Sequence, residues 1–389
     1  MRENPNMVIF IKGLDLGGYS GGADLFGANL ACGLQKLGVP TRLCICYKFD
    51  TDAERNIVEH IADAGIAPCF LLNWNGHTNG MSYLQALSKL DAYLDGLDID
   101  IIHSHFHTGT LLAIWLKLSR RTRRVARTAH ADHEWQRGWD GLLKQAIIRT
   151  LIFAIFPLLV DLEVGVSTYA AEVLNQRFLA RMLKKRTLVI PNAIPTQEGT
   201  QSDASQARFT GWVGDHPVIG SVGRLEEQKG YKYFLEALPE VLLVFPDLEI
   251  WLIGEGSLLN ELKEQSQKLR ISDHVVFMGK QAKVSSLLSR MDLFVSSSLY
   301  EGLPTVVLEA MDMGVPCVVT AIPGTMDIVT DKNGLLVRAK DSKGLAKVII
   351  AALGTPSIRK NIVANATQTM ERFRIDSVCR EYLEAYHRL

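Results

Sequence analysis

Two cations and two carboxylates in the second half of the chain have the types and spacing that suit a phosphate- and hydroxyl-binding site. Arg224 and Lys229 lie in the segment VGRLEEQKG, between an apolar run and an amphipathic helical pattern. Arginine offers a planar fork of donors and lysine a mobile point charge, and each charge-assisted contact contributes about 1.5–3 kcal/mol. Glu301 and Glu309 lie in the segment EGLPTVVLE. By composition alone, the two cations are equally consistent with solvated loop residues.

A helix start is predicted between the two glutamates. Pro304 is a residue type favoured at the beginning of a helix. Glu301 then lies in the preceding loop and Glu309 inside the helix, so that they can contact different parts of one ligand. The N–H groups of Leu303 and Thr305 would lie at the positive end of the helix dipole, which suits a diphosphate. The alternative is a capping carboxylate followed by a solvated glutamate.

A glycine-rich turn follows the first predicted strand, in the sequence GLDLGGYSGGADLFGANL that starts at Gly13, and a helix is expected from about Ala23. Glycines at the carboxyl end of a parallel strand let backbone N–H groups approach an anion. The turn lacks the GxGxxG spacing of dinucleotide-binding folds and the GxxxxGK[ST] pattern of P-loops, which argues against both. A tight turn with a purely structural role remains the alternative.

The elements that position these residues follow from an alternation of short apolar runs and helical patterns, which predicts an α/β fold with doubly wound parallel sheets. In the first half, strands are expected at Met7–Ile11, Thr41–Tyr47, Ile99–His103, Val125–Thr128, Leu162–Ser167 and Thr187–Ile190. In the second half, they are expected at Val218–Val222, Glu249–Ile253, Val275–Met278, Leu293–Ser296 and Cys317–Thr320.

The length of 389 residues exceeds what one core usually supports, so two domains with a ligand cleft between them are expected. The first covers residues 1–195 and is completed by a helix in residues 371–389. The second covers residues 210–370, and the polar stretch 196–209 is a predicted linker.

Charge and cysteine usage exclude several classes of protein and site. Lys+Arg and Asp+Glu both number 42, so no overall field favours nucleic acid. Six cysteines without a CxxC pair suit a reducing cytosol, and Cys44 and Cys46 are expected to pack on one face of a strand. Asp98 and Asp100 are expected to begin a strand, and the alternating histidines His103, His105 and His107 to line a cleft or pack, since no carboxylate or cysteine at ligand spacing accompanies them as in a metal site.

Membrane contact is left open by two segments. The N-terminal MRENPNMVIFI enters a strand without a cleavage site, so no signal peptide is expected. The longest apolar run, Leu151–Val160, contains Pro157 and is shorter than the roughly 20 residues of a membrane span. It predicts a buried helix or, together with Leu142–Ile148, a helix resting on a membrane surface. The basic stretch Lys117–Arg127 predicts a solvated turn or a contact with anionic lipid.

The order and spacing of these segments resemble the retaining family 4 glycosyltransferases of the GT-B fold, along nearly the whole chain. The resembling segments are the glycine turn with Gly17, Gly18, Gly21 and Gly22, DIDIIHSHFH at 98–107, RTAHADH at 127–133, VSTYAAEVL at 166–174, VIPNAI at 189–194, VGRLEEQKG at 222–230, LIGEGSLLNELK at 252–263 and EGLPTVVLE at 301–309. Ala193 stands where the family usually has glycine, and Glu255 where it often has aspartate.

The resemblance implies two facing α/β domains and a role for each candidate residue. Arg224 and Lys229 would neutralise the departing diphosphate, so that no metal or other cofactor is needed. Glu301 would bind hydroxyls of the donor sugar, Glu309 the ribose hydroxyls, and His130 would lie beside the transferred sugar. The segment Gly302, Leu303, Pro304 and Thr305 would face the phosphates, and the loop with Gly17, Gly18, Gly21 and Gly22 would close over the substrates.

The function implied is retaining transfer of a sugar from a nucleotide diphosphate sugar, with a UDP-sugar favoured. The acceptor would be a glycan, a lipid-linked glycan or a small molecule, and the setting cell-surface polysaccharide or lipopolysaccharide biosynthesis in the cytoplasm, with peripheral membrane contact. Two other functions share this architecture. One is a nucleotide-sugar 2-epimerase, and the other is a non-catalytic subunit that binds nucleotide sugars.

Overall fold

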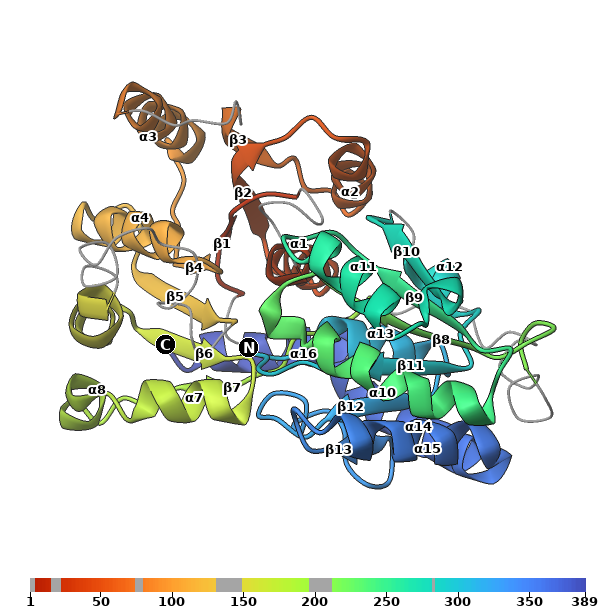
Figure 1. Cartoon of the computed structure of the whole chain (residues 1–389). Helices are drawn as coiled ribbons and strands as arrows, with labels where there is room; N and C mark the ends of the chain where they lie inside the picture. The colour runs from red at the N-terminus through yellow and green to blue at the C-terminus, as the bar shows by residue number, and fades with distance from the viewer. Residues whose placement is uncertain (1–3, 15–21, 74–79, 131–148, 196–211, 282–283) are drawn as a thin grey trace. The chain divides into compact units, whose positions relative to one another are not determined.

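The computed structural model describes residues 4–14, 22–73, 80–130, 149–195, 212–281 and 284–389 (Figure 1). The chain divides into two compact units. Unit 1 comprises Met1–Pro195 and Ile375–Leu389, and unit 2 comprises Thr196–Arg374. Each unit is built around one parallel sheet with helices on both faces, which confirms the predicted α/β class.

Among its described residues, unit 1 holds a seven-stranded parallel sheet in the order β3-β2-β1-β4-β5-β6-β7. The strands are β1 Met7–Ile11, β2 Thr41–Lys48, β3 Cys69–Asn73, β4 Ile101–Ser104, β5 Arg124–Ala129, β6 Leu162–Gly165 and β7 Leu188–Val189. Side chains alternate between the two faces of the sheet: Ile9 and Ile11 join one apolar cluster, and Val8 and Phe10 join another. The strand β3 was not expected from the sequence.

The helices of unit 1 cover the two apolar clusters. They are α1 Gly22–Lys36, α2 Asp52–Asp63, α3 Gly80–Leu94, α4 His107–Leu118, a π-helix at Leu151–Ile155, α6 Phe156–Leu159, α7 Thr168–Asn175, α8 Phe178–Met182 and α16 Ile375–His387. The C-terminal helix α16 packs closely on α1, since a Cβ atom at Gly33 would lie 2.4 Å from the Sγ atom of Cys379. Its aromatic residues Tyr382 and Tyr386 belong to the same core as β1.

Unit 2 holds, among its described residues, a six-stranded parallel sheet in the order β10-β9-β8-β11-β12-β13. The strands are β8 Val218–Val222, β9 Glu249–Ile253, β10 Val275–Gly279, β11 Leu293–Ser296, β12 Cys317–Thr320 and β13 Leu335–Val337. Four of them have the bounds expected from the sequence, and β13 was missed. The helices are α10 Tyr231–Val244, α11 Leu259–Lys268, α12 Val284–Leu288, α13 Thr305–Asp312, α14 Ser342–Gly354 and α15 Pro356–Met370.

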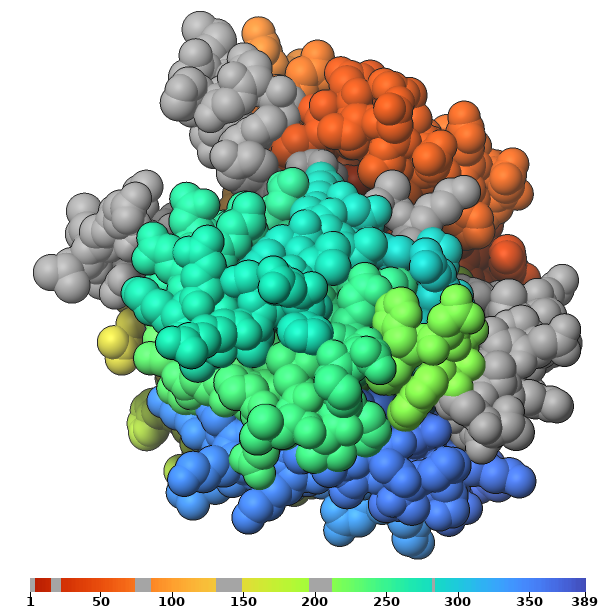
Figure 2. Space-filling view, turned by 45° about the vertical axis from the view of Figure 1, so that its right-hand side comes forward, coloured from red at the N-terminus to blue at the C-terminus, as the bar shows by residue number. Residues whose placement is uncertain are grey.

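The helices α11, α10, α14 and α15 lie side by side and form much of the surface in Figure 2, where they run from green and teal to blue. The helix α10 illustrates why they pack. Its buried residues Phe234, Leu235, Leu238 and Val241 recur at helical spacing and face the core. The helix ends at Val244, and Phe245 and Pro246 follow outside it.

Two predicted strand boundaries in unit 1 were wrong by two residues, for local reasons. The strand β6 ends at Gly165 because Ser167 is the N-cap of α7, where its hydroxyl accepts a hydrogen bond from the Ala170 N–H at 3.2 Å. The strand β4 begins at Ile101 rather than Ile99. The Asp100 carboxylate accepts a hydrogen bond from the Asn6 N–H at 3.0 Å. Asp100 thus lies immediately before β4, which agrees with its expected position at the start of a strand.

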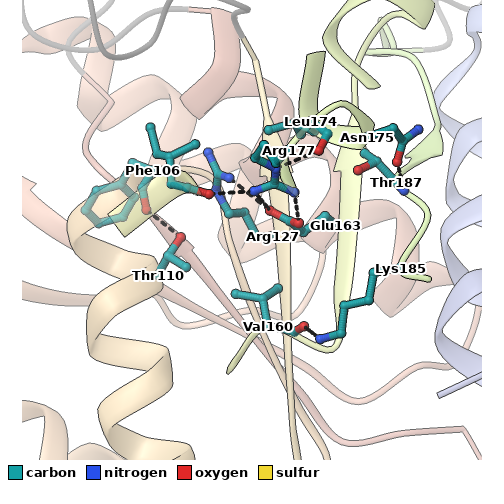
Figure 3. A network of polar contacts seen from close by, with 11 residues as sticks. Phe106, Thr110, Arg127, Val160, Glu163, Leu174, Asn175, Arg177, Lys185 and Thr187 are labelled. Atoms are coloured by element: carbon teal, nitrogen blue, oxygen red, sulfur yellow. Dashed lines mark hydrogen bonds and ion pairs between the residues drawn. The ribbon is translucent and has the colours of Figure 1, made fainter. Parts of the chain in front are cut away.

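A buried charged cluster fixes β5 and β6 against the helices of unit 1 (Figure 3). The Glu163 carboxylate pairs with Arg127 at 3.1 Å and with Arg177 at 3.2 Å, and all three residues are at most 7% exposed. Arg177 also donates to the carbonyl oxygens of Leu174 at 2.6 Å and Ile152 at 2.7 Å. Since removing one partner of such a cluster leaves a buried charge, it costs about 3–5 kcal/mol. The cluster therefore anchors β5.

The apolar segment at 151–160 is only partly the buried helix that was expected. Ile152, Phe156 and Val160 are buried, whereas Phe153 and Leu158 are exposed. The helix changes from π to α geometry immediately before Pro157. Residues Leu142–Ile148 lie outside the described part. In the part that the structure describes, no helix combines the length and the apolar character needed to cross a bilayer.

Candidate functional site

The strand order reverses at one place in each sheet, between β1 and β4 in unit 1 and between β8 and β11 in unit 2. In open parallel sheets, ligands bind outside the carboxyl ends of the strands at such a reversal. The predicted site residues follow these strands or their neighbours. Arg224 and Lys229 follow β8, Glu301 follows β11, His130 follows β5, and the glycine turn follows β1.

In unit 2, a close backbone approach brings the two halves of the predicted site together. Gly230 ends a 3-10 turn at Glu227–Lys229 with φ of 61°, and a Cβ atom there would lie 2.2 Å from the carbonyl oxygen of Ser297. Only glycine fits this conformation and this distance. The Ser297 hydroxyl donates to the Lys229 carbonyl at 2.9 Å, and the Leu299 N–H donates to the Gln228 carbonyl at 2.8 Å. The turn after β8 is thus bonded to the loop after β11.

Lys229 and Glu301, predicted to bind different parts of a ligand, form an ion pair with each other. The Lys229 Nζ atom lies 2.5 Å from Glu301 Oε1, and the Ser298 hydroxyl donates to the same oxygen at 2.8 Å. Gln228 Nε2 donates to Glu301 Oε2 at 3.3 Å and to the Tyr300 carbonyl at 2.9 Å. The side chains of Lys229 and Glu301 are 18% and 8% exposed. A phosphate that binds Lys229 must therefore compete with Glu301.

Arg224 contacts this network through Gln228. Its side chain is exposed, and Nη2 lies 3.5 Å from Gln228 Oε1, at the outer limit of a hydrogen bond. Gln228 and Ser298 were not among the residues expected from the sequence. Their signals were faint: Gln228 stands between the two cations, and Ser298 lies in a run of three serines at a strand end. Neither carries the charge that drew attention to its neighbours.

The helix α13 begins where the sequence predicted, with Pro304 as the N-cap and Thr305 as its first residue. Gly302, Leu303 and Pro304 are buried, while Thr305 and Glu309 are half-buried. The loop after β12 rests on this segment, because a Cβ atom at Gly324, whose φ is 79°, would lie 2.4 Å from the Gly302 carbonyl. Burial raises the pKa of the Glu309 carboxyl, which disfavours its ionised form until hydroxyl donors reach it.

In unit 1, His130 pairs with a second histidine. His130 Nε2 and His105 Nδ1 are 2.9 Å apart, and His105 is 4% exposed. His105 stacks on His103 with ring centroids 4.7 Å apart. His103 Nε2 lies 2.8 Å from the Thr128 hydroxyl, and its Nδ1 contacts the Tyr386 hydroxyl of α16. Burial lowers the pKa of His103 to about 3 and that of His105 well below its ordinary value, so both rings are neutral at pH 7.

The three alternating histidines therefore separate into two environments. His103 and His105 project from the same face at the end of β4, whereas His107 is the first residue of α4 and stacks on Phe156 at 6.2 Å between centroids. His107 does not share a strand face with the other two, because β4 ends at Ser104. Over the described residues, no group of three or more histidine, cysteine, aspartate or glutamate side chains has the geometry to hold a metal ion.

The glycine turn is described only at its end. Gly17, Gly18 and Gly21 lie outside the described residues, and Gly22 is the first residue of α1. The Asp24 carboxylate accepts a hydrogen bond from the Lys12 N–H at 2.7 Å, which holds the start of α1 to the end of β1. The positions of Gly17, Gly18 and Gly21 at a ligand therefore stay predictions.

Family models match both halves of the chain. A model of "Glycosyltransferase Family 4" matches residues 20–198, and a model of "Glycosyl transferases group 1" matches residues 203–369. The chain belongs to glycosyltransferase family 4. The match includes Arg224, Lys229, Glu301 and Glu309 in the second half and His130 in the first.

Several curated proteins are similar to this family 4 chain. It is 31% identical over 172 residues to the lipopolysaccharide core biosynthesis glycosyltransferase LpsE of Rhizobium meliloti, covering 44% of this chain and 49% of that protein. It is 28% identical over 169 residues to the UDP-Gal:alpha-D-GlcNAc-diphosphoundecaprenol alpha-1,3-galactosyltransferase of Escherichia coli, covering 42% and 44%. The chain thus spans about half the length of these relatives.

Solved structures share the fold along the whole family 4 chain. The Anabaena protein Alr3699/HepE, in complex with UDP and glucose, aligns with a TM-score of 0.77 at 19% identity, covering 99% of this chain and 100% of that one. Together with the two parallel-sheet units, this likeness establishes a GT-B type fold. At this identity the likeness concerns the fold alone.

Proposed function

We propose that this chain transfers a sugar from a nucleotide diphosphate sugar to a hydroxyl group of an acceptor. The observation that carries the proposal is the position of Lys229, which lies at the reversal between β8 and β11 and is ion-paired to Glu301. The helix α13 begins shortly after Glu301, at Thr305. A cation and a helix N-terminus at this place suit a diphosphate. Membership of glycosyltransferase family 4 supports the same conclusion.

In the proposed reaction, the bond between the sugar C1 and the phosphate oxygen breaks, and a bond from C1 to the acceptor oxygen forms. The acceptor proton passes to the departing phosphate. Lys229 and Arg224 neutralise the charge that develops on the diphosphate, which is where a transition state of this kind needs most stabilisation. No metal ion or cofactor takes part. Transfer on the same face of the sugar, with retention at C1, fits the lack of a dedicated nucleophile among the proposed site residues.

The remaining residues bind the donor. When a donor phosphate pairs with Lys229, the ion pair between Lys229 and Glu301 is broken. The Glu301 carboxylate can then accept hydrogen bonds from sugar hydroxyls. Glu309, whose carboxyl has a pKa raised by desolvation, accepts from the ribose hydroxyls. The N–H groups of Gly302, Leu303 and Thr305, around the N-cap Pro304, face the phosphates. In unit 1, His130 contacts the transferred sugar.

A uridine donor and a lipid-linked or lipopolysaccharide glycan acceptor are part of the proposal. They are supported by the names of similar proteins: one relative is a UDP-Gal transferase acting on a diphosphoundecaprenol-linked sugar, another acts in lipopolysaccharide core biosynthesis, and one structural neighbour holds UDP and glucose.

We also propose that unit 1 touches the cytoplasmic face of a membrane through α6, α8 and the π-helix before them. Four large apolar side chains are exposed there, with the exposed fractions Phe153 36%, Leu158 51%, Phe178 77% and Met182 58%. The neighbouring cations Arg181, Lys184 and Arg186 are exposed as well. Apolar side chains beside cations fit an anionic lipid surface.

The basic stretch at 117–127 is less suited to lipid than its composition indicated. Lys117 pairs with Asp161 at 2.6 Å, Arg121 with Asp91, Arg123 with Asp98 at 2.8 Å, Arg124 with Asp161 at 3.7 Å and Arg127 with Glu163 at 3.1 Å. Internal carboxylates therefore neutralise much of its charge. For this reason the cations assigned to the proposed lipid contact are Arg181, Lys184 and Arg186.

The catalytic proposal is tested by incubating the purified chain with a panel of nucleotide sugars and acceptors, with and without a chelator. Release of nucleotide diphosphate that depends on the acceptor, at the same rate with the chelator, is expected. Conversion of the donor without an acceptor would favour an epimerase, and donor binding without any turnover would favour a binding subunit. Loss of activity in the chelator would refute metal independence.

The membrane proposal is tested by co-sedimentation with vesicles of phosphatidylcholine alone or mixed with phosphatidylglycerol. Binding is expected only to the anionic vesicles, and Phe178→Ser with Met182→Ser should weaken it at least about tenfold. The matched control is Leu243→Ser, which alters an apolar residue of unit 2 that is 87% exposed. Equal binding by the double variant and the control would refute the assigned surface.

A further inference from the structure

His105 occupies the reversal of the unit 1 sheet, at the position that corresponds to the loop after β11 in unit 2. It follows β4 directly, and its backbone N–H donates to the Phe10 carbonyl of β1 at 3.1 Å. Its ring Nδ1 lies 2.9 Å from Nε2 of His130, which follows the adjacent strand β5. The proposed reaction gives His105 no role, although its ring is hydrogen-bonded to His130.

The surroundings of His105 keep its ring neutral and immobile. It stacks on His103, and Phe26 of α1 meets it edge-on with centroids 5.7 Å apart. A Cβ atom at Gly27 would lie 3.2 Å from its Cδ2 atom, so that α1 is pressed against the ring. Its Nε2 atom is buried and has no hydrogen-bond partner within the described part of the chain. A charged imidazole here would be costly, because neither His103 nor Phe26 supplies a negative charge.

When both imidazoles are neutral, a hydrogen bond between them requires that one ring donates its N–H and the other accepts. The tautomers of His105 and His130 are therefore coupled, and the orientation of the His130 ring is set by a partner that cannot rotate. His130 itself is half-buried and meets Phe26 edge-on at 5.9 Å. A ring fixed in one tautomer presents a defined donor or acceptor to a sugar hydroxyl, whereas a freely exchanging ring presents either.

We propose that His105 is a positioning residue for His130, which it holds in one orientation and one tautomer for contact with the transferred sugar. This inference rests on the proposed function for the identity of the ligand. The geometry that carries it, a bond between two imidazoles with one ring locked by α1 and His103, is independent of that function.

The test compares two substitutions of His105 with a packing control. His105→Asn keeps a polar group near the position of Nδ1, whereas His105→Leu fills similar space without a hydrogen bond. Phe26→Leu removes the edge contact to both rings and leaves their hydrogen bond in place. The tautomer of His130 is measured by ¹⁵N NMR of histidine-labelled protein at pH 8, with its signal assigned by its loss in His130→Gln.

The expected result is one tautomer of His130 in the wild type, in Phe26→Leu and in His105→Asn, and a mixture in His105→Leu. With an active donor and acceptor pair, kcat should fall about tenfold in His105→Leu with the donor KM changed less than about twofold, and His105→Asn should recover most of it. A single, unchanged His130 tautomer in His105→Leu would overturn the proposal. So would a changed tautomer with wild-type kcat.

The two proposals fail in different ways. If no nucleotide sugar is turned over by the wild type, the proposed function is wrong, while the NMR comparison still decides whether His105 fixes His130. If His105→Leu does not fold, His105→Asn and Phe26→Leu still decide the point: His105→Asn must keep the wild-type tautomer, and a mixture in that folded variant would contradict the hydrogen-bond role.

Discussion

The two sheet reversals of this molecule share a strand order and differ in charge. At the reversal of unit 2, Lys229 and Glu301 form an ion pair with Arg224 nearby. At the reversal of unit 1, the rings of His105 and His130 are hydrogen-bonded, and burial lowers the pKa of His105 well below its ordinary value and that of the nearby His103 to about 3. The fold therefore provides the place for a ligand, and the residue types decide which part of the ligand it suits. A charged site fits a diphosphate, and a neutral one fits sugar hydroxyls.

Charge alone does not mark a site, as the cluster of Arg127, Glu163 and Arg177 shows. These residues are at most 7% exposed, and Arg177 also donates to the backbone carbonyl oxygens of Leu174 and Ile152. The side chain of Lys229, in contrast, is 18% exposed in the turn after β8 and is held mainly by Glu301. A cation that can exchange one partner for a ligand is a binding residue, and a cation whose donors are satisfied internally is a structural one.

The largest loss of activity is predicted for a substitution of Lys229, at the charged reversal of unit 2. Lys229→Ala should lower kcat/KM for sugar transfer about a thousandfold, because a buried charge contact with the departing diphosphate is lost. The fold should persist, since the residue lies in a turn held by backbone contacts. The matched control is Lys232→Ala, which removes an exposed lysine at the start of α10. Full activity in Lys229→Ala would end the diphosphate assignment.

The neutral, buried His103 at the unit 1 reversal predicts that the stability of unit 1 falls in acid. The pKa of His103 is about 3 in the folded chain, below the ordinary value near 6.5, so the unfolded chain takes up the proton first as the pH falls. The contribution of this neutral ring to the free energy of unfolding is therefore greatest above the ordinary pKa. It falls by about 2 kcal/mol between pH 7 and pH 5.

This loss is measured by hydrogen exchange in peptides from β4 and β5. The change with pH should shrink in His103→Asn and persist in His60→Gln, which alters an exposed histidine of α2. An equal pH dependence in all three proteins would show that His103 is not the source.

The ion pair of unit 2 predicts a split between turnover and binding. Glu301→Gln should lower kcat about 10- to 100-fold, because the sugar loses a charged acceptor. The affinity for UDP should be unchanged or higher, since Lys229 no longer has an anionic competitor. Calorimetric titration with UDP and steady-state kinetics measure the two effects. A large loss of UDP affinity with little change in kcat would contradict the assignment of Glu301 to the sugar.

The smallest effect is expected at Glu309, whose buried carboxyl has a raised pKa. Folding therefore disfavours its ionised form, and the penalty is present at pH 7 and disappears as the pH falls below the ordinary carboxyl pKa of about 4.3. Glu309→Gln should stabilise unit 2 slightly at pH 7 and not at pH 4, measured by urea unfolding. Glu261→Gln, on an exposed face of α11, is the control. Destabilisation by Glu309→Gln at pH 7 would refute the argument.

The sequence predicted the α/β class and most strands because their patterns are local. A buried parallel strand is a short apolar run, and β8, β9, β11 and β12 are nearly continuous runs with the bounds expected. The strands β3 and β13 were missed. Both are short apolar runs, CFLLN and LLV, and a run of this length cannot be told from part of a buried helix by periodicity alone.

What the sequence by itself determined is which residue types follow which strand: the cations after β8, the glutamate after β11, the proline at the start of α13 and the histidines after β4 and β5. Only the tertiary structure decided their partners. Lys229 meets Glu301 across 72 residues of chain, and His105 meets His130 across 25. Local periodicity records the face on which a residue lies, whereas its partner depends on which strands become neighbours in the sheet, and no short segment contains that information.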